Sequence, residues 1–178
     1  EACPHNLAPT ASTTAALALG DALAVALLDA RGFGPDDFAR SHPGGSLGRR
    51  LLTHVRDVMR SGDDVPTVGP LTGVSDAILA MSRGGLGLVA VVGDAGRVLG
   101  IFTDGDLRRA FEKHIDLQSA RIDSVMHANP RTIAPDRLAV EAVEMMERYR
   151  INALLVADAD GRLLGALNMH DLFTARVI

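Results

Sequence analysis

The sequence contains no tryptophan, one tyrosine and five phenylalanines, so aromatic residues make up only 3% of its 178 residues. Proteins that hold single-stranded nucleic acid stack the bases on aromatic side chains, and this chain offers few of them. It also has no excess of basic residues, because 18 Lys and Arg stand against 22 Asp and Glu, for a formal net charge of -4 at pH 7. We therefore expect no nucleic acid among its partners.

Cysteine is almost absent, since Cys3 is the only one. It cannot form an internal disulfide, so nothing in the sequence indicates an oxidising compartment. The six histidines show no paired spacing such as His-x-x-x-His, and a single cysteine does not make a zinc signature. We expect no metal site, with a histidine cluster between subunits as the open alternative.

Long apolar runs are also absent. The longest one, residues 22–28, is far shorter than the roughly 20 residues of a membrane span, and no basic segment precedes it as in a secretory signal. The chain begins with Glu1 rather than with Met. We expect a cytoplasmic protein with no membrane partner, and a fragment of a longer chain.

What the sequence does contain is an internal repeat. The stretch Gly100–Arg109 is typical of a buried strand that leads directly into a helix, and a weaker copy, Gly165–Leu172, follows 65 positions later. The same shift aligns further similar residues: Thr67 with Thr132, Ala77 with Ala142, Met81 with Met146, Val91 with Val156, Gly96 with Gly161 and Asp106 with Asp171. Each copy is predicted to form a turn, a short strand, a helix, two strands and a closing helix.

The two copies, residues 54–115 and residues 120–178, are called here the first and the second repeat. Neither is large enough to bury its apolar face well alone, so we expect the two to pack on each other. The predicted fold class is therefore α/β (α+β), a tandem pair with pseudo-twofold symmetry behind a helical segment, residues 1–53.

That helical segment begins with an apolar helix over residues 14–31, which Gly32 ends. Ser12, Thr13 or Thr14 is expected to cap it. Its interior carries only two charged residues, so it is apolar nearly all round and needs partners on several sides. We expect those partners upstream in a longer chain or on another subunit.

The remainder of residues 1–53 is predicted to be mostly irregular. Pro35 is expected at the first position of a second, short helix. Residues 41–48 are rich in Gly and Pro and are predicted to form a loop, and residues 49–54 a linker into the repeats.

The repeats resemble the cystathionine-β-synthase (CBS) domain, which occurs as a pair. The resemblance rests on Val58-Met59 and Val125-Met126 at the openings and on the spacing of Gly100, Thr103 and Asp106 at the first strand-to-helix junction. It implies that an adenosine-type or other nucleotide binds in the cleft between the repeats. In that family the Thr hydroxyl and the Asp carboxylate of the junction contact the ribose of the ligand.

The second junction departs from this pattern. Asn168 stands where the first repeat has Thr103, whereas Asp171 keeps the carboxylate. We expect Asn168, His170 and Asp171 to form a second half-site that does not bind one ligand in the same way as the first. Several cations could balance a phosphate, with His170 the best candidate, although each alone is typical of solvated surface charge: Arg83, Arg108, Arg109, Arg131 and His170.

A second interpretation of Thr103 and Asp106 is purely structural. Thr-x-x-Asp at a helix start approximates a capping box, and spacing alone favours capping over ligand binding. The same helix N-terminus also receives anions and sugar hydroxyls well, so both roles can hold together.

The segment before the repeats narrows the resemblance to the arabinose-5-phosphate isomerase family, in which a sugar isomerase (SIS) domain precedes a CBS pair. The motifs are Asn6-Leu-Ala-Pro-Thr10, Gly20-Asp-Ala-Leu-Ala24 and Ser41-His-Pro-Gly-Gly45, followed by Ile101-Phe-Thr-Asp-Gly-Asp-Leu-Arg108. On this resemblance residues 1–53 are the C-terminal remnant of the SIS domain with its linker.

The resemblance implies the interconversion of ribulose 5-phosphate and arabinose 5-phosphate, which supplies the lipopolysaccharide sugar Kdo. It uses a base and no redox cofactor. His42 matches the active-site histidine of the family, and imidazole suits proton transfer near neutral pH. The other active-site groups lie upstream, so we expect this fragment alone to be inactive. We further expect a sugar phosphate as the substrate and a nucleotide or CMP-Kdo as an effector at the CBS pair. We also expect the protein to form a homo-oligomer, either a tetramer or a dimer.

Two alternatives stay open at this point. The pair could serve mainly to hold an oligomer together, or the chain could be a stand-alone nucleotide sensor. The apolar helix over residues 14–31 argues against the second alternative, because a free module would not expose that surface.

Overall fold

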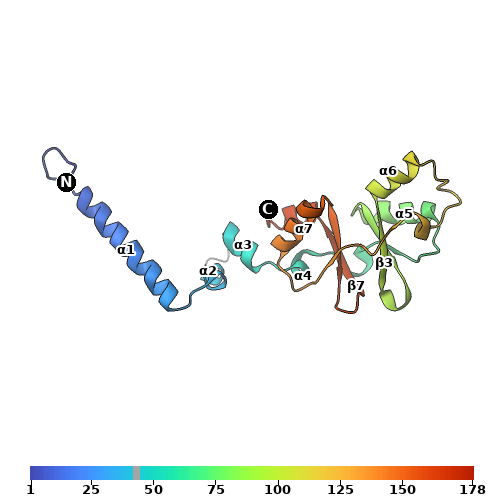
Figure 1. The fold of residues 1–178 in the computed structure, drawn as a ribbon, viewed down its shortest axis with the longest axis horizontal. Coiled ribbons are helices and arrows are strands. Elements are labelled where there is room, and N and C mark those ends of the chain that lie inside the picture. The colour runs from blue at the N-terminus through green and yellow to red at the C-terminus, as the bar shows by residue number, and fades with distance from the viewer. Residues whose placement is uncertain (42–44) are drawn as a thin grey trace. The chain divides into compact units, whose positions relative to one another are not determined.

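The structure is a computed structural model that describes residues 1–41 and 45–178. It divides into two compact units, Glu1–Gly48 and Arg49–Ile178 (Figure 1). The first unit contains the helices α1 (Ala11–Ala30) and α2 (Pro35–Ser41), and α3 (Ser46–Leu52) contains the boundary between the units. His42 lies outside the described residues.

Helix α1 starts earlier than the sequence predicted. Its N-cap residue is Thr10, but the side chain of Thr10 accepts no hydrogen bond from the backbone amides of the first turn. The backbone N–H of Thr10 donates to Oε2 of Glu1 at 2.6 Å. The expected cap at residues 12–14 is therefore wrong. Because these residues already lie in the first turn, the hydroxyls of Thr13 and Thr14 donate back to the carbonyl oxygen of Thr10 at 2.9 and 3.0 Å.

None of the 20 residues of α1 is buried against the rest of the described chain. By length and composition alone the helix could cross a membrane, since an 18-residue window has a mean hydropathy of 1.6. The uninterrupted apolar run covers only residues 22–28, whereas the full helix stays apolar across its two aspartates. A core helix of a globular domain has the same composition, so this one helix does not decide between the two environments.

The segment after α1 contains one helix more than expected. Gly32 adopts a φ of 63° and ends α1, and Pro35 is the first residue of α2; both observations confirm the sequence analysis. The predicted loop and linker over residues 41–54 are partly wrong, because Ser46–Leu52 is helical. One glycine inside a helix costs only about 1 kcal/mol, so Gly48 does not interrupt it.

The second unit contains both repeats, and each has the predicted order of elements, with one additional two-residue strand at His127–Ala128 in the second repeat. The first repeat comprises α4 (Val55–Val58), β1 (Thr67–Val68), α5 (Val74–Gly84), β2 (Leu88–Val92), β3 (Val98–Thr103) and α6 (Asp104–Glu112), with 3-10 turns at Gly62–Asp64 and Asp94–Gly96. The second comprises a 3-10 turn at Ile122–Ser124, β4 (His127–Ala128), β5 (Thr132–Ile133), α7 (Ala139–Tyr149), β6 (Ala153–Ala157), β7 (Leu163–Asn168) and α8 (Met169–Thr174).

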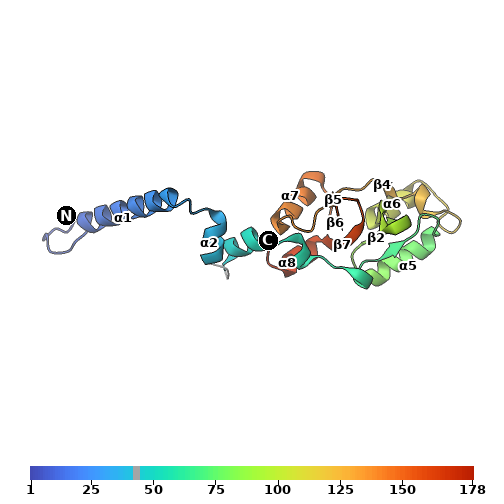
Figure 2. The ribbon, with the colours of Figure 1, turned by 90° about the horizontal axis from the view of Figure 1, so that it is seen from below.

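The strands form two small sheets, one of order β1-β2-β3-β4 and one of order β5-β6-β7. In each sheet a parallel pair is followed by an antiparallel pair, and the two registers correspond at a shift of 65 residues. Helix α7 lies at one end of the unit and α5 and α6 lie at the other, with the strands between them (Figures 1 and 2). The predicted tandem α/β pair is thereby confirmed.

Strand alternation decides which residues face the partner repeat. In β2, Val89 and Val91 are fully buried in a core with α5, whereas Leu88 and Ala90 are fully buried in a different core shared with the second repeat. Successive side chains of a strand point to opposite faces, so one strand supplies both cores.

The core between the repeats is complementary in side-chain size. Ala90 corresponds to Leu155 at the 65-residue shift, and Ile101 corresponds to Ala166; all four belong to the same buried cluster. A large side chain in one repeat thus matches a small one in the other.

The opening segments of the repeats are exchanged. Val55, at the start of the first repeat, is buried in the core of the second, and its N–H donates to the carbonyl oxygen of Arg137 at 2.8 Å. Ile122, at the start of the second repeat, is buried in the core of the first, and its N–H donates to the carbonyl oxygen of Thr72 at 2.9 Å. Such reciprocal contacts are the mark of a twofold arrangement.

The exchange predicts that Ile122→Ala destabilises the first repeat although the residue follows it in sequence. Ile122 is fully buried, so the free energy of unfolding should fall by about 2–5 kcal/mol. Urea unfolding followed by circular dichroism measures this. Leu71→Ala is the control, because Leu71 is 66% exposed and its loss should change the free energy by no more than about 0.5 kcal/mol. Equal losses in the two variants would contradict the exchange.

Candidate ligand-binding site

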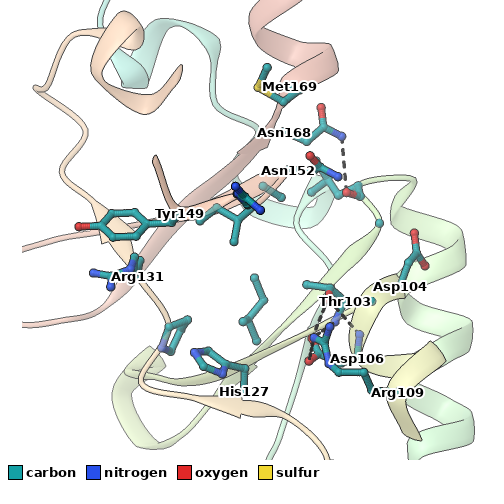
Figure 3. A pocket seen from close by; sticks show the side chains of 18 of the residues that line it. Thr103, Asp104, Asp106, Arg109, His127, Arg131, Tyr149, Asn152, Asn168 and Met169 are labelled. Atoms are coloured by element: carbon teal, nitrogen blue, oxygen red, sulfur yellow. Dashed lines mark hydrogen bonds and ion pairs between the residues drawn. The ribbon is translucent and has the colours of Figure 1, made fainter. Parts of the chain in front are cut away.

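A cavity of about 690 Å³ lies between the two repeats within the second unit (Figure 3). Its wall comes from the strand-to-helix junctions of both repeats and from the segments around β4, β5 and the end of α7. The lining residues are Leu86, Gly87, Ile101, residues 103–106, Arg109, His127, Pro130, Arg131, residues 149–153 and residues 168–170.

The first junction, Thr103 and Asp106, lies on one wall of this cavity. Thr103 ends β3 in extended backbone and is the N-cap of α6. Oδ2 of Asp106 accepts from the backbone N–H of Thr103 at 2.9 Å and from its hydroxyl at 2.6 Å, while Oγ1 of Thr103 accepts from the N–H of Asp106 at 3.3 Å. The capping box predicted as the structural interpretation is therefore present.

After capping, the first junction still has free hydrogen-bond acceptor positions. The hydroxyl proton of Thr103 is used on Asp106, and Oδ1 of Asp106 accepts from Nη2 of Arg109 at 2.6 Å. A hydroxyl oxygen has two acceptor positions and a carboxylate about four, so acceptor positions remain on both residues while no donor does. A group that binds here without disturbing the cap must donate, as a sugar hydroxyl can.

The second junction is built in the same way but is placed differently. Asn168 caps α8, with Oδ1 accepting from the N–H of Asp171 at 3.0 Å and its own N–H donating to Oδ2 of Asp171 at 3.0 Å. Asn168 and His170 line the cavity, whereas Asp171 does not. Its carboxylate is paired with Arg60, whose Nη2 lies 2.9 Å from Oδ1. The structure thus brings together four of the five predicted cleft residues: Thr103, Asp106, Asn168 and His170.

The wall opposite the first junction carries an aromatic ring and several cations. Figure 3 shows Tyr149 and Arg131 across the cavity from Thr103 and Asp106. The guanidinium carbon of Arg131 lies 3.5 Å from the centroid of the Tyr149 ring, within the range of a cation–π contact. Around the whole cavity, basic residues outnumber the two carboxylates of Asp104 and Asp106; they are Arg109, His127, Arg131, Arg150 and His170. The cavity therefore favours an anionic ligand.

Sequence reasoning identified only part of this wall. Of the cations it proposed for a phosphate, Arg109 and Arg131 line the cavity, whereas Arg83 and Arg108 do not. It missed other lining residues: His127, Tyr149, Arg150 and Asn152. The signal for His127 was in the sequence, because the residue directly follows the repeated Val-Met pair.

A comparison with protein families matches the CBS domain to residues 55–113 and 122–178. The chain belongs to the CBS domain family. Its repeats are the two CBS domains of a pair, so the resemblance drawn from the Val-Met openings and the junction is confirmed. Among the described residues, no group of three or more His, Cys, Asp or Glu is placed to hold a metal ion.

Among curated proteins, arabinose 5-phosphate isomerase KdsD of Pseudomonas aeruginosa is 55% identical over 178 residues, which are 100% of this chain and 55% of the relative. The enzyme of the same name from Escherichia coli strain K12 is 51% identical over the same span, 54% of its length. The chain thus spans about half the length of the curated relatives it matches.

Solved structures share the fold of the CBS pair. A CBS-domain containing protein of Agrobacterium tumefaciens is 29% identical with a TM-score of 0.61, and the match covers 70% of this chain and 93% of that one. The Arabidopsis thaliana protein CBSX2, solved in complex with AMP, is 24% identical with a TM-score of 0.60, covering 69% of this chain and 95% of that one.

The capping geometry yields a prediction that needs no ligand. Thr103→Ala removes the side-chain acceptor for the N–H of Asp106, so the free energy of unfolding should fall by about 1 kcal/mol. Denaturant unfolding measures the loss. Thr103→Ser keeps the hydroxyl and should retain most of that stability; if it loses as much as alanine, the methyl group and not the cap matters.

Proposed function

We propose that this chain is the C-terminal part of an arabinose 5-phosphate isomerase, and that its CBS pair is the regulatory ligand-binding module of that enzyme. The observation that carries the proposal is the identity of 55% over all 178 residues with the Pseudomonas aeruginosa enzyme. The match extends through residues 1–48, outside the CBS pair, so it does not rest on the CBS fold alone.

The reaction is an aldose–ketose isomerisation of a sugar phosphate, in which a base moves a proton between C1 and C2 through an enediol. His42 is the proposed base contributed by this chain. Residues 1–53 are the proposed end of the SIS domain, and residues 54–115 and 120–178 the proposed CBS domains. The exposure of every residue of α1 is consistent with this division, because an apolar helix with no buried residue in this chain lacks the partners that the rest of a domain would provide. The proposed site of action is the cytoplasm.

The role of His42 is tested in the full-length isomerase. If its imidazole transfers the proton, His42→Ala should lower kcat/KM by roughly 10²- to 10⁴-fold, measured with ribulose 5-phosphate in a coupled assay. His5→Ala is the matched control and should keep normal turnover, because His5 is exposed and matches no active-site position. Normal turnover in His42→Ala rejects the assignment.

The proposed effector of the CBS pair is a nucleotide or the nucleotide sugar CMP-Kdo. A cavity of about 690 Å³ has the size of a small-molecule site. Its wall offers acceptors for sugar hydroxyls at Thr103 and Asp106, a ring at Tyr149, and guanidinium groups at Arg131 and Arg150 for phosphate. CMP-Kdo is the activated product of the pathway that arabinose 5-phosphate feeds, so its binding would provide feedback.

Calorimetric titration of the chain with CMP-Kdo and with AMP tests this proposal. We expect saturable heat from at least one of them, and Arg131→Ala should weaken its affinity about tenfold, since a hydrogen bond to a charged group is worth about 1.5–3 kcal/mol. Arg108→Ala removes an equal charge outside the cavity and should leave the affinity within about twofold. Absence of heat from both ligands with the unmodified chain discards the sensor.

Assembly of a homo-oligomer, a tetramer or dimer, is the second candidate role of the pair. Phe111 near the end of α6 is 73% exposed and Phe173 on α8 is 67% exposed. These two side chains are the candidates for burial against a second copy of the chain. Deleting residues 54–178 from the full-length enzyme and measuring its mass by light scattering separates this role from ligand sensing.

A further inference from the structure

The second junction of the pair is already occupied by a side chain of the protein itself. Arg60 directs Nε and Nη2 onto Oδ1 of Asp171 at 3.1 and 2.9 Å, and its Nη1 onto the carbonyl oxygen of Gly84 at 3.3 Å. The Arg60 side chain is 31% exposed and that of Asp171 only 12%. All three contacts join segments far apart in sequence, so the arginine is held in place by the fold.

The counterpart of Arg60 in the other repeat is His127. Both directly follow a Val-Met pair, and both pair with the strand that ends at a junction: Arg60 bridges Ala166, and His127 bridges Ile101. The two side chains therefore start from equivalent backbone positions. The shorter imidazole lines the open cavity, whereas the longer guanidinium extends across the equivalent position and reaches the carboxylate.

The carboxylates of the two junctions are also paired from different directions. Asp106 is bound by Arg109, which lies on the same helix with a side chain 61% exposed at the edge of the cavity. The residue 65 positions after Arg109 is Thr174, which brings no charge. Asp171 is therefore paired by Arg60, which lies outside α8, whereas Asp106 is paired by an arginine of its own helix.

The wall opposite the second junction lacks the groups that shape the cavity at the first. The counterparts of Arg131 and Tyr149 are Pro66 and Gly84. Pro66 packs directly on Gly84, since a Cβ at Gly84 would lie 2.6 Å from Cγ of the proline. No ring or cation faces Asp171 from these two positions, and the carbonyl oxygen of Gly84 accepts from Nη1 of Arg60.

We propose that Arg60 is an internal occupant of the second half-site, so that the CBS pair binds one ligand per chain, at the Thr103–Asp106 junction. The guanidinium neutralises Asp171 and fills the position that a ligand hydroxyl takes at Asp106. This proposal deepens the proposed function and rests on the binding of an anionic ligand there.

The test is the stoichiometry of AMP and CMP-Kdo binding, measured by calorimetry on the 178-residue chain and on Arg60→Ala. We expect one site per chain in the unmodified protein and a second, weaker one in Arg60→Ala. That second event should vanish in Arg60→Ala/Asp171→Ala. Arg56→Ala, which removes an exposed arginine from the same segment, should keep one site. Two sites in the unmodified chain, or one in Arg60→Ala, overturns the proposal.

Failure of the ligand assignment is distinguishable from failure of this inference. If the unmodified chain binds neither probe, the proposed effector is wrong. Arg60→Ala then decides the inference alone: binding that depends on Asp171 supports an occupied half-site, and no binding in any variant overturns it. The melting temperature gives a readout that needs no ligand. Arg60→Ala and Asp171→Asn should each lower the Tm by roughly 2–4 °C or more. Because both remove the same ion pair, the Tm of Arg60→Ala/Asp171→Asn should be no lower than that of the less stable single variant.

Discussion

The structure depends on apolar burial between two repeats that cannot each bury their own sheet. Leu88 and Ala90 of β2 project away from the core of their own repeat into one that Leu155 and Ala166 share. The exchanged opening segments add a second contact between the repeats, since Val55 of the first repeat is buried in the core of the second. Because neither repeat is complete alone, the two junctions are held at a fixed distance, and the cleft between them is a consequence of the shared core rather than of a flexible hinge.

This arrangement lets the two repeats diverge without loss of the fold. Ala90 and its counterpart Leu155 differ in size, yet both are fully buried in the shared core, so the fold accommodates a change of size at this position. The junctions diverge in the same manner: Asp106 is paired within its own helix, and Asp171 is paired by Arg60 from elsewhere in the fold. The charge of each carboxylate is balanced in both cases, but Asp106 lines the cavity between the repeats, whereas Asp171 does not.

Local pattern and periodicity were enough to predict the pair, because the 65-residue shift seen in the sequence recurs in the strand registers, and the alternation of β2 assigns each of its residues to a face. They could not predict β4, which has only two residues and exists because its neighbour β3 offers an edge. Nor could they place Asp171, since its partner Arg60 lies 111 positions away in sequence. The sequence assigned Asp171 to the cleft by analogy with Asp106, and the tertiary contact decides otherwise.

The capping box at the first junction is part of the fold, and it limits what the proposed site can bind. Asp106 is 9% exposed and already accepts from Thr103 and Arg109, so its carboxylate is fixed before any ligand arrives. A fixed acceptor selects for a donor at one position, because a misplaced or accepting group would leave a nearly buried carboxylate facing another acceptor. Preorganisation of this kind lowers the entropic cost of binding, and the capping box provides it without any additional residue.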